Sequence, residues 1–180
     1  MLILDAQRDL RRAFLGGFVG QNVSGLIWLL SAVISTFVSP LYGMAALFVV
    51  SIFIYPLTQL GSRLIGRAGK LSEGNTLGQL ATQTAFTVPV GFLLVAAATF
   101  YREDWFYPAA MIVVGAHYLP FVFLYGMREF GALAVSLIAG GVVIALYIPG
   151  MFSLEGWIGA ILMIVFAFVG RWVVLREERR

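Results

Sequence analysis

A run of residues without a single charge, from Ala13 to Ser62, restricts the folds open to this chain more than any other feature. A membrane-spanning helix needs about 20 apolar residues, so this run is long enough for two of them. In the whole chain 61% of the residues are hydrophobic and 12% are charged, whereas soluble domains have about 45–50% and about 25%. Lipid is the solvent that accommodates such an excess. The sequence therefore predicts an integral membrane protein.

Prolines, glycines and charged residues divide the chain into six apolar segments. Ser39-Pro40 separates the first two, because proline has no N–H and restricts the residue before it. Pro149-Gly150 ends the fifth segment. The predicted fold is all-α, a single transmembrane domain over residues 1–180 with six helices at about 14–38, 41–60, 77–100, 105–125, 131–148 and 156–175.

The basic residues fall almost entirely on one side of these six spans. Arg102 is the exception, and it stands beside Glu103 and Asp104. The others are Arg8, Arg11, Arg12, Arg63, Arg67, Lys70, Arg128, Arg171, Arg176, Arg179 and Arg180. Short loops rich in Lys and Arg stay in the cytoplasm, so we expect both termini there. Anionic headgroups at helix ends account for the net charge of +3, and no nucleic-acid partner is expected.

The first residues predict a short interfacial helix that leads into the first span. Leu2, Ala6, Leu10 and Phe14 recur at every fourth position and so form one apolar stripe. Basic residues flank this stripe, as in helices that lie in the plane of a membrane surface.

Polar side chains inside the apolar segments are the candidates for function, because each costs free energy in lipid unless it is satisfied. Asp, Glu and Lys are absent from the middle of the predicted spans, which argues against a carboxylate proton relay. The candidates are Asn22, Gln59, Gln83, Thr87, His117 and Tyr118. Most lie in the predicted cytoplasmic half of the membrane. We expect a polar cavity that opens to the cytoplasm and narrows towards His117.

His117 is the sharpest single candidate, since no other side chain in the membrane interior changes its charge near neutral pH. It would sense or relay a proton, or bind a ligand. The alternative is a neutral ring bonded to Tyr118, an amide or a backbone carbonyl. Such side chains hold membrane helices together at about 0.6 kcal/mol per bond, so a purely structural role for the whole set stays open.

Catalytic and metal sites are not expected. Cysteine is absent and there is one histidine, which excludes a cysteine site, a site of several histidines and a haem held by two. Ser24 and His117 are the serine and histidine at compatible depths, but no acid is placed to orient the histidine. We expect no enzyme activity, no cofactor and no metal.

Three segments carry a resemblance. The string Gly-Ala-His-x-Leu-Pro is present as Gly115 to Pro120 and is followed by Phe121 and Leu124-Tyr125. The other two are the charged run Asp5 to Phe14 and the string Asn75-Thr76-Leu77-Gly78, where the family tends to have Asn-Pro-Leu-Gly. Together, over about residues 5–145, they resemble a family of small bacterial membrane proteins that is defined only as a domain of unknown function. The resemblance implies a polytopic bacterial membrane protein with the Gly-Ala-His region as its signature, and it implies no activity.

Three functions remain open. The first is a small transporter or channel-like protein, the second a non-catalytic accessory, scaffold or sensor protein, and the distant third an intramembrane enzyme. A cavity requires that Asn22, Gln59, Gln83 and His117 point into one interior space, whereas a scaffold scatters them over separate helix contacts. We expect the first, in the bacterial plasma membrane, with the lipid bilayer and a small polar solute as partners. A homodimer is left open.

Overall fold

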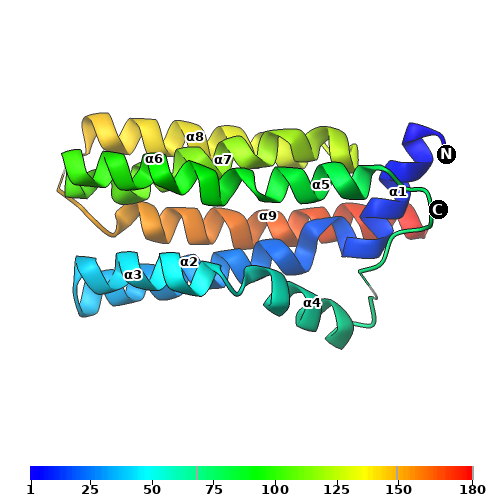
Figure 1. The fold of residues 1–180 in the computed structure, drawn as a ribbon, viewed down its shortest axis with the longest axis horizontal. Helices are drawn as coiled ribbons and strands as arrows, with labels where there is room; N and C mark the ends of the chain where they lie inside the picture. Colours follow the sequence, from blue (N-terminus) through cyan, green and yellow to red (C-terminus); the bar gives the residue numbers. More distant parts are fainter. Residues whose placement is uncertain (68, 149, 180) are drawn as a thin grey trace.

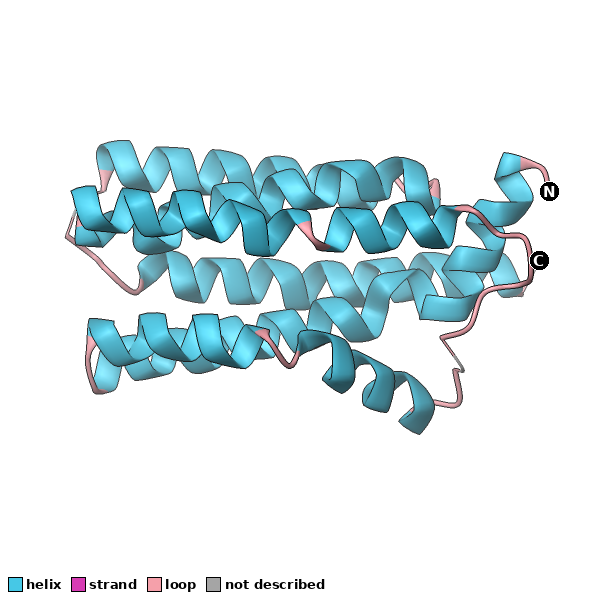
Figure 2. Ribbon diagram, in the orientation of Figure 1, coloured by secondary structure: helices cyan, strands magenta, loops and turns pink. Residues whose placement is uncertain are grey.

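The computed structural model describes residues 1–67, 69–148 and 150–179, and within these ranges the chain forms helices and loops but no strand. Pro149 and Arg180, which entered the sequence predictions, lie outside the described residues. Long helices run side by side along one axis (Figures 1 and 2). The elements are α1 (Ile3–Phe14), η1 (Leu15–Gly17), α2 (Phe18–Phe37), α3 (Pro40–Ser51), α4 (Ile54–Leu64), α5 (Leu77–Ala85), α6 (Thr87–Tyr101), η2 (Glu103–Trp105), α7 (Phe106–Tyr125), α8 (Glu129–Tyr147) and α9 (Leu154–Glu178). The all-α prediction is confirmed.

Among the described residues, five helical stretches are long and apolar enough to cross a membrane. They are Ile3–Phe37, Leu77–Tyr101, Glu103–Tyr125, Glu129–Tyr147 and Leu154–Glu178. The pair α3 and α4 passes the same test together but is bent by 61°, and it makes a sixth span if the pair is counted as one. The lengths and apolar composition of these helices are therefore compatible with a multi-pass membrane protein of five or six spans. Both termini lie at the same end of the bundle (Figure 1).

The core lies between α2, α7, α8 and α9. Helix α2 packs along α9, and α7 packs along α8, while α3 and α6 cover the sides of α2 and α7. Large side chains of this core are fully buried, among them Tyr107, Met111, Leu137 and Met163. Because lipid is as apolar as this core, close packing rather than hydrophobic burial is what holds such helices together.

Two of the predicted spans are broken. The segment predicted at 41–60 divides into α3 and α4 at Ile52, and the segment predicted at 77–100 is interrupted between α5 and α6 at Phe86. A proline follows each break by three or four positions, Pro56 in α4 and Pro89 in α6. Proline donates no N–H to the carbonyl four residues before it, and its ring crowds that carbonyl. The prolines therefore account for both breaks.

Helix α1 lies obliquely across the end of the bundle that carries the termini (Figure 1). It ends where Leu15, Gly16 and Gly17 adopt positive φ angles of 49°, 63° and 78°. Glycine adopts such angles without strain, so the chain turns here and helix α2 begins at Phe18. Ala6 and Leu10 of the apolar stripe are buried against the bundle, whereas Leu2 at its start is exposed.

Candidate functional site

His117 on α7 faces the interruption between α5 and α6. Its Nδ1 lies 2.9 Å from the carbonyl oxygen of Thr84 and 3.2 Å from Oγ1 of Thr87. The Thr87 hydroxyl donates to the same carbonyl at 2.7 Å. The last carbonyls of a helix have no partner in a following turn, and His117 and Thr87 supply partners at the end of α5. A carbonyl only accepts, so Nδ1 carries the proton in this arrangement and Nε2 is the acceptor of the ring.

An aromatic cluster surrounds the other side of His117. The ring centroid of Phe121 lies 4.9 Å from that of His117, and Tyr118 lies at 5.4 Å. Tyr118 is buried and stacks on Phe130 of α8, at 6.0 Å between centroids. His117 itself is half-buried. The histidine thus sits between an aromatic contact of α7 with α8 and a polar contact of α7 with α5.

Gln83 and Thr87 share a shallow groove on the outer face of α5 and α6. The groove is lined by Gln83, Phe86, Thr87, Val90, Gly91, Leu93 and Leu94. Its surface is mostly apolar, and it is open along one side. His117 does not line the groove itself, but it contacts Thr87, which does.

Asn22 and Gln59 lie elsewhere. The Asn22 amide donates to the carbonyl of Phe18 in its own helix at 2.8 Å. Gln59 lies beside the loop at Gly69, close to Phe14 at the end that carries the termini. The described contacts therefore bring together Thr87, His117 and Tyr118, with Gln83 in the adjoining groove. They do not place Asn22, Gln59, Gln83 and His117 around one interior space as predicted.

Two buried polar atoms of α2 and α4 were missed by the choice of candidates. Oε1 of Gln21 and Oγ1 of Thr58 are buried and have no hydrogen-bond partner among the described residues. Thr58 faces α2 at Gly20. Gln21 precedes the chosen Asn22 by one position, which on a helix is a rotation of about 100°. The sequence shows that residues 21 and 22 both carry amide side chains, but it does not show which of the two points into the bundle.

A second polar cluster joins α2, α3 and α7 far from His117. The hydroxyl of Tyr107 lies 2.6 Å from that of Ser31 and 2.7 Å from that of Ser35. Ser31 also donates to the carbonyl of Gly43 at 2.7 Å. These groups satisfy one another inside the bundle, so the cluster acts as a contact between helices.

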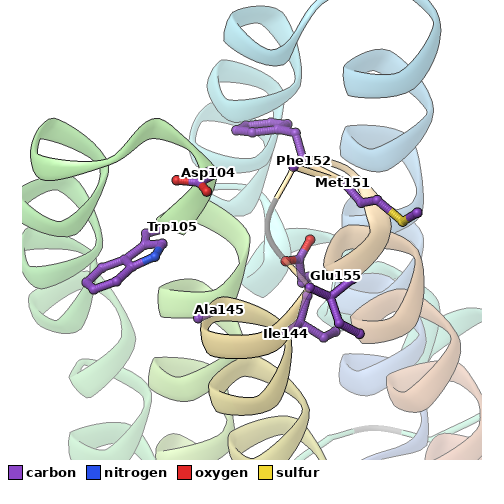
Figure 3. Close-up of a pocket in the computed structure, with 9 residues that line it drawn as sticks. Asp104, Trp105, Ile144, Ala145, Met151, Phe152 and Glu155 are labelled. Carbon is purple, nitrogen blue, oxygen red and sulfur yellow. The ribbon is translucent and has the colours of Figure 1, made fainter.

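Near this cluster, a pocket holds a buried carboxylate at the start of α9. Glu155 is 4% exposed, and its Oε2 has no hydrogen-bond partner in the described ranges. Asp104, Trp105 and Phe152 line the same pocket (Figure 3). Glu155 was not among the candidate residues chosen from the sequence. A lone carboxylate directly before an apolar run was the signal that would have found it.

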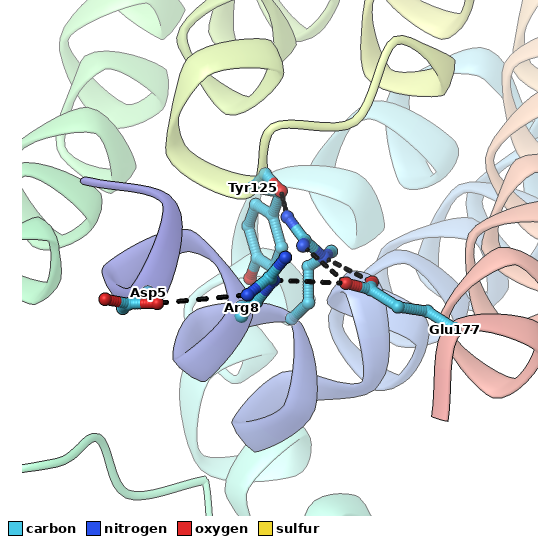
Figure 4. A network of polar contacts seen from close by, with 5 residues as sticks. Asp5, Arg8, Tyr125 and Glu177 are labelled. Atoms are coloured by element: carbon cyan, nitrogen blue, oxygen red, sulfur yellow. Dashed lines mark hydrogen bonds and ion pairs between the residues drawn. The ribbon is translucent and has the colours of Figure 1, made fainter. Parts of the chain in front are cut away.

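The end of the bundle that carries the termini is held by charged and polar bonds. Arg11 of α1 donates to Glu177 of α9 and to the carbonyl of Tyr125 at the end of α7 (Figure 4). Asn75 donates to Asp9 at 2.8 Å and to the carbonyl of Ala6 at 3.1 Å. The three segments that carry the family resemblance therefore come together at this end, because α1 contacts both Asn75 and the end of α7.

Comparison with known proteins identifies a family but no activity. Neither a curated protein nor a solved structure matches the chain. A family model described as a family of unknown function, DUF7010, matches residues 3–177. Because this match covers nearly the whole sequence, the chain belongs to DUF7010, a family of unknown function.

Proposed function

We propose that the protein crosses the plasma membrane of a bacterium six times, with both termini in the cytoplasm. The position of both termini at one end of the bundle supports an even number of crossings, with α3 and α4 forming one bent span (Figure 1). Arg8, Arg11, Arg67 and Arg176 belong to segments at that same end, and short basic segments stay in the cytoplasm. The bacterial origin rests on the resemblance of the Gly-Ala-His signature.

We further propose that the protein is a small, non-catalytic transporter or channel-like protein that admits a small polar solute from the cytoplasm towards His117. Transporters bind substrate where discontinuous helices expose backbone groups within the membrane. Here two broken spans, α3–α4 and α5–α6, flank the packed helices α2, α7, α8 and α9.

The observation that carries this proposal is the contact of His117 with the interruption of α5–α6. Irregular backbone at membrane depth is tolerated where it lines a cavity or is buried in protein. The Thr84 carbonyl accepts bonds from His117 and Thr87, while Thr87 also opens into the groove with Gln83. A polar solute that replaced these bonds would reach His117 along α5.

The second candidate is an accessory, scaffold or sensor protein, and such a protein could act as a homodimer. The amide of Asn22 bonds within its own helix, and Gln59 lies apart from His117. Polar groups distributed in this way serve helix packing. In that case the groove of α5 and α6 is filled by lipid.

Thiol labelling in oriented vesicles separates the two candidates. The chain has no cysteine, so each single cysteine variant carries one label site. We expect Gln83→Cys and Thr87→Cys to react with a positively charged, membrane-impermeant methanethiosulfonate added to the cytoplasmic face. Leu94→Cys is the matched control, because it lines the same groove about two helical turns further along α6. It should remain unlabelled.

Each outcome decides between the candidates. Labelling of Thr87→Cys but not of Leu94→Cys, with slower labelling in a His117→Phe background, supports an aqueous path that ends at His117. If Thr87→Cys is as unreactive as Leu94→Cys, the groove faces lipid and the transporter proposal is wrong. Reaction only from the opposite face would overturn the proposed orientation.

A further inference from the structure

Glu155 lies buried at the end of the bundle opposite the termini. It occupies the first turn of α9, where the neighbouring Gly156 packs against Ala32 and the ring of Tyr107. This close packing draws the start of α9 into the bundle and leaves Glu155 4% exposed. The side chain points into the pocket between η2, α8 and the start of α9 (Figure 3).

No cation forms an ion pair with this carboxylate in the described part of the chain. Arg102 precedes Asp104 and Trp105 of the lining by two and three positions, but its Nη2 and Nε bind Asp104 at 2.6 and 3.1 Å. Its guanidinium also lies over the ring of Trp105, at 5.4 Å from the centroid. Arg102 is thus committed to Asp104 and to the indole, and it forms no ion pair with Glu155 within 4.0 Å.

The walls of the pocket offer Glu155 little else. Ile144 and Ala145 of α8 and Phe152 of the preceding loop supply apolar surface. Among the described residues, one side-chain donor in the lining is buried without a partner, the indole N–H of Trp105. The space between these side chains is too narrow for a water molecule. A larger ligand therefore has no room while the pocket is closed.

A proton is the ligand that this geometry fits. Oε2 of Glu155 is buried without a partner, an environment that destabilises the ionised carboxylate and favours the neutral acid. Asp104 adds a second negative charge to the same lining, which disfavours ionisation of Glu155 further. We propose that Glu155 is a proton-binding site at this end of the bundle, and that loss of its proton opens the pocket to water.

The step balances as a simple acid dissociation. The O–H bond of the Glu155 carboxyl breaks, and the proton passes to solvent water at the mouth of the pocket. The resulting carboxylate needs a donor, and the free N–H of Trp105 lies in the same pocket to supply one. The negative charge formed on Glu155 shifts η2 and the start of α9, and the shift admits water to the pocket. The inference does not depend on passage of a solute past His117.

Other titratable groups that face Glu155 are few. Helix η2 presents Asp104, which is paired with Arg102, and α7 presents Tyr107, whose hydroxyl is shared by Ser31 and Ser35. The lining from α8 is apolar. Glu103 is exposed and serves as a matched control for a carboxylate of the same short element.

Infrared difference spectroscopy of the purified full-length protein tests the site. The C=O stretch of a protonated carboxylic acid is followed as pH is raised from about 5 to about 9, a range above the ordinary Glu pKa of about 4.3. We expect the native protein to lose a carboxylic-acid band over this range. Glu155→Gln, which keeps the shape of the protonated group, should lack the change, and Glu103→Gln should retain it. If the native protein shows no protonated carboxyl above pH ~5, or if Glu155→Gln retains the band, the proposal is overturned.

A cysteine in the pocket tests the opening. Ala145→Cys is labelled with a membrane-impermeant maleimide at each pH, and its rate is divided by that of the exposed Glu103→Cys to remove the ionisation of the thiol itself. We expect the ratio to rise several-fold with pH in the native background and to stay low and constant with Glu155→Gln. A ratio with the same pH dependence in both backgrounds would show that Glu155 does not control the pocket.

Discussion

The guanidinium of Arg11 donates two hydrogen bonds of 2.8 Å to the carboxylate of Glu177, and so joins the first helix of the chain to the last (Figure 4). Parallel N–H···O bonds of this kind are stronger and more directional than a single contact. Nη1 of Arg11 also donates to the carbonyl of Tyr125, one of the last carbonyls of α7. A single side chain on α1 thus fixes the ends of α7 and α9.

Arg11→Ala should lower the free energy of unfolding by about 1–2 kcal/mol, because it removes the ion pair and a helix-end hydrogen bond together. The Glu177 side chain is 39% exposed, so solvent screening limits the ion pair itself, and Glu177→Gln should cost only about 0.5 kcal/mol. Unfolding by SDS in mixed micelles measures both. Arg8→Ala is the control, since its contacts with Asp5 and Glu177 are long, at 3.9 and 3.8 Å. An equal loss for Arg8→Ala would contradict the role of Arg11.

Asp9 makes the attachment of α1 sensitive to acid. Burial tends to raise the pKa of the Asp9 carboxyl, but hydrogen bonds from Asn75 and Ser72 outweigh it and hold the pKa below the ordinary 3.8. The unfolded chain therefore takes up a proton at a higher pH than the folded protein does. The stabilisation is complete above the ordinary pKa and disappears as pH falls through the lowered one.

The melting temperature of the native protein should accordingly fall as pH drops below about 4. Asn75→Ala removes one of these bonds, so it should be less stable at neutral pH and should lose less on acidification. Asp5→Asn, on the exposed face of α1, is the matched control and should follow the native protein. Parallel acid profiles for Asn75→Ala and the native protein would show that Asn75 does not hold the carboxylate.

Much of the fold was predictable because the signals are local. Ser39 and Pro40 start α3 as expected, with the Ser39 hydroxyl accepting a hydrogen bond from the N–H of Tyr42. Pro56 and Pro89 are further local signals, and each follows a break in its span. Charge-free length, proline and glycine act within a few residues, so their effects can be read along the chain.

The site was less predictable because it depends on how helices rotate and pair. Neighbouring residues of one helix point about 100° apart, so the pattern could not say that Gln21 rather than Asn22 is buried without a partner. The bond of Arg11 to Glu177 joins residues that are 166 positions apart. Burial of Glu155 likewise depends on contacts of α9 with α2 and α7.

Gly43 allows α3 to approach α2 so closely that no larger residue fits. A Cβ at this position would lie 1.7 Å from Oγ of Ser35 and 2.8 Å from the carbonyl oxygen of Ser31. Gly43→Ala should therefore destabilise the protein by about 2–3 kcal/mol, through forced separation of the helices and loss of the Ser31 bond to Gly43. Gly20→Ala is the control, because its Cβ would meet Thr58 at an ordinary 3.7 Å. Equal unfolding free energies for the two variants would mean that the α2–α3 contact yields easily.

His117 and Thr87 should prove energetically coupled, because both satisfy the carbonyl of Thr84 at the end of α5. Either group alone keeps this carbonyl bonded, so the second loss should cost more than the first. We expect His117→Phe and Thr87→Val each to lower the free energy of unfolding by about 0.5 kcal/mol, and the double variant to exceed the sum by about 0.5–1 kcal/mol. A matched cycle of His117→Phe with Thr99→Val, whose hydroxyl bonds within its own helix at Val95, should be additive. Additivity in both cycles would show that His117 does not hold the interruption of α5–α6, and the structural basis for a path ending at this histidine would be lost with it.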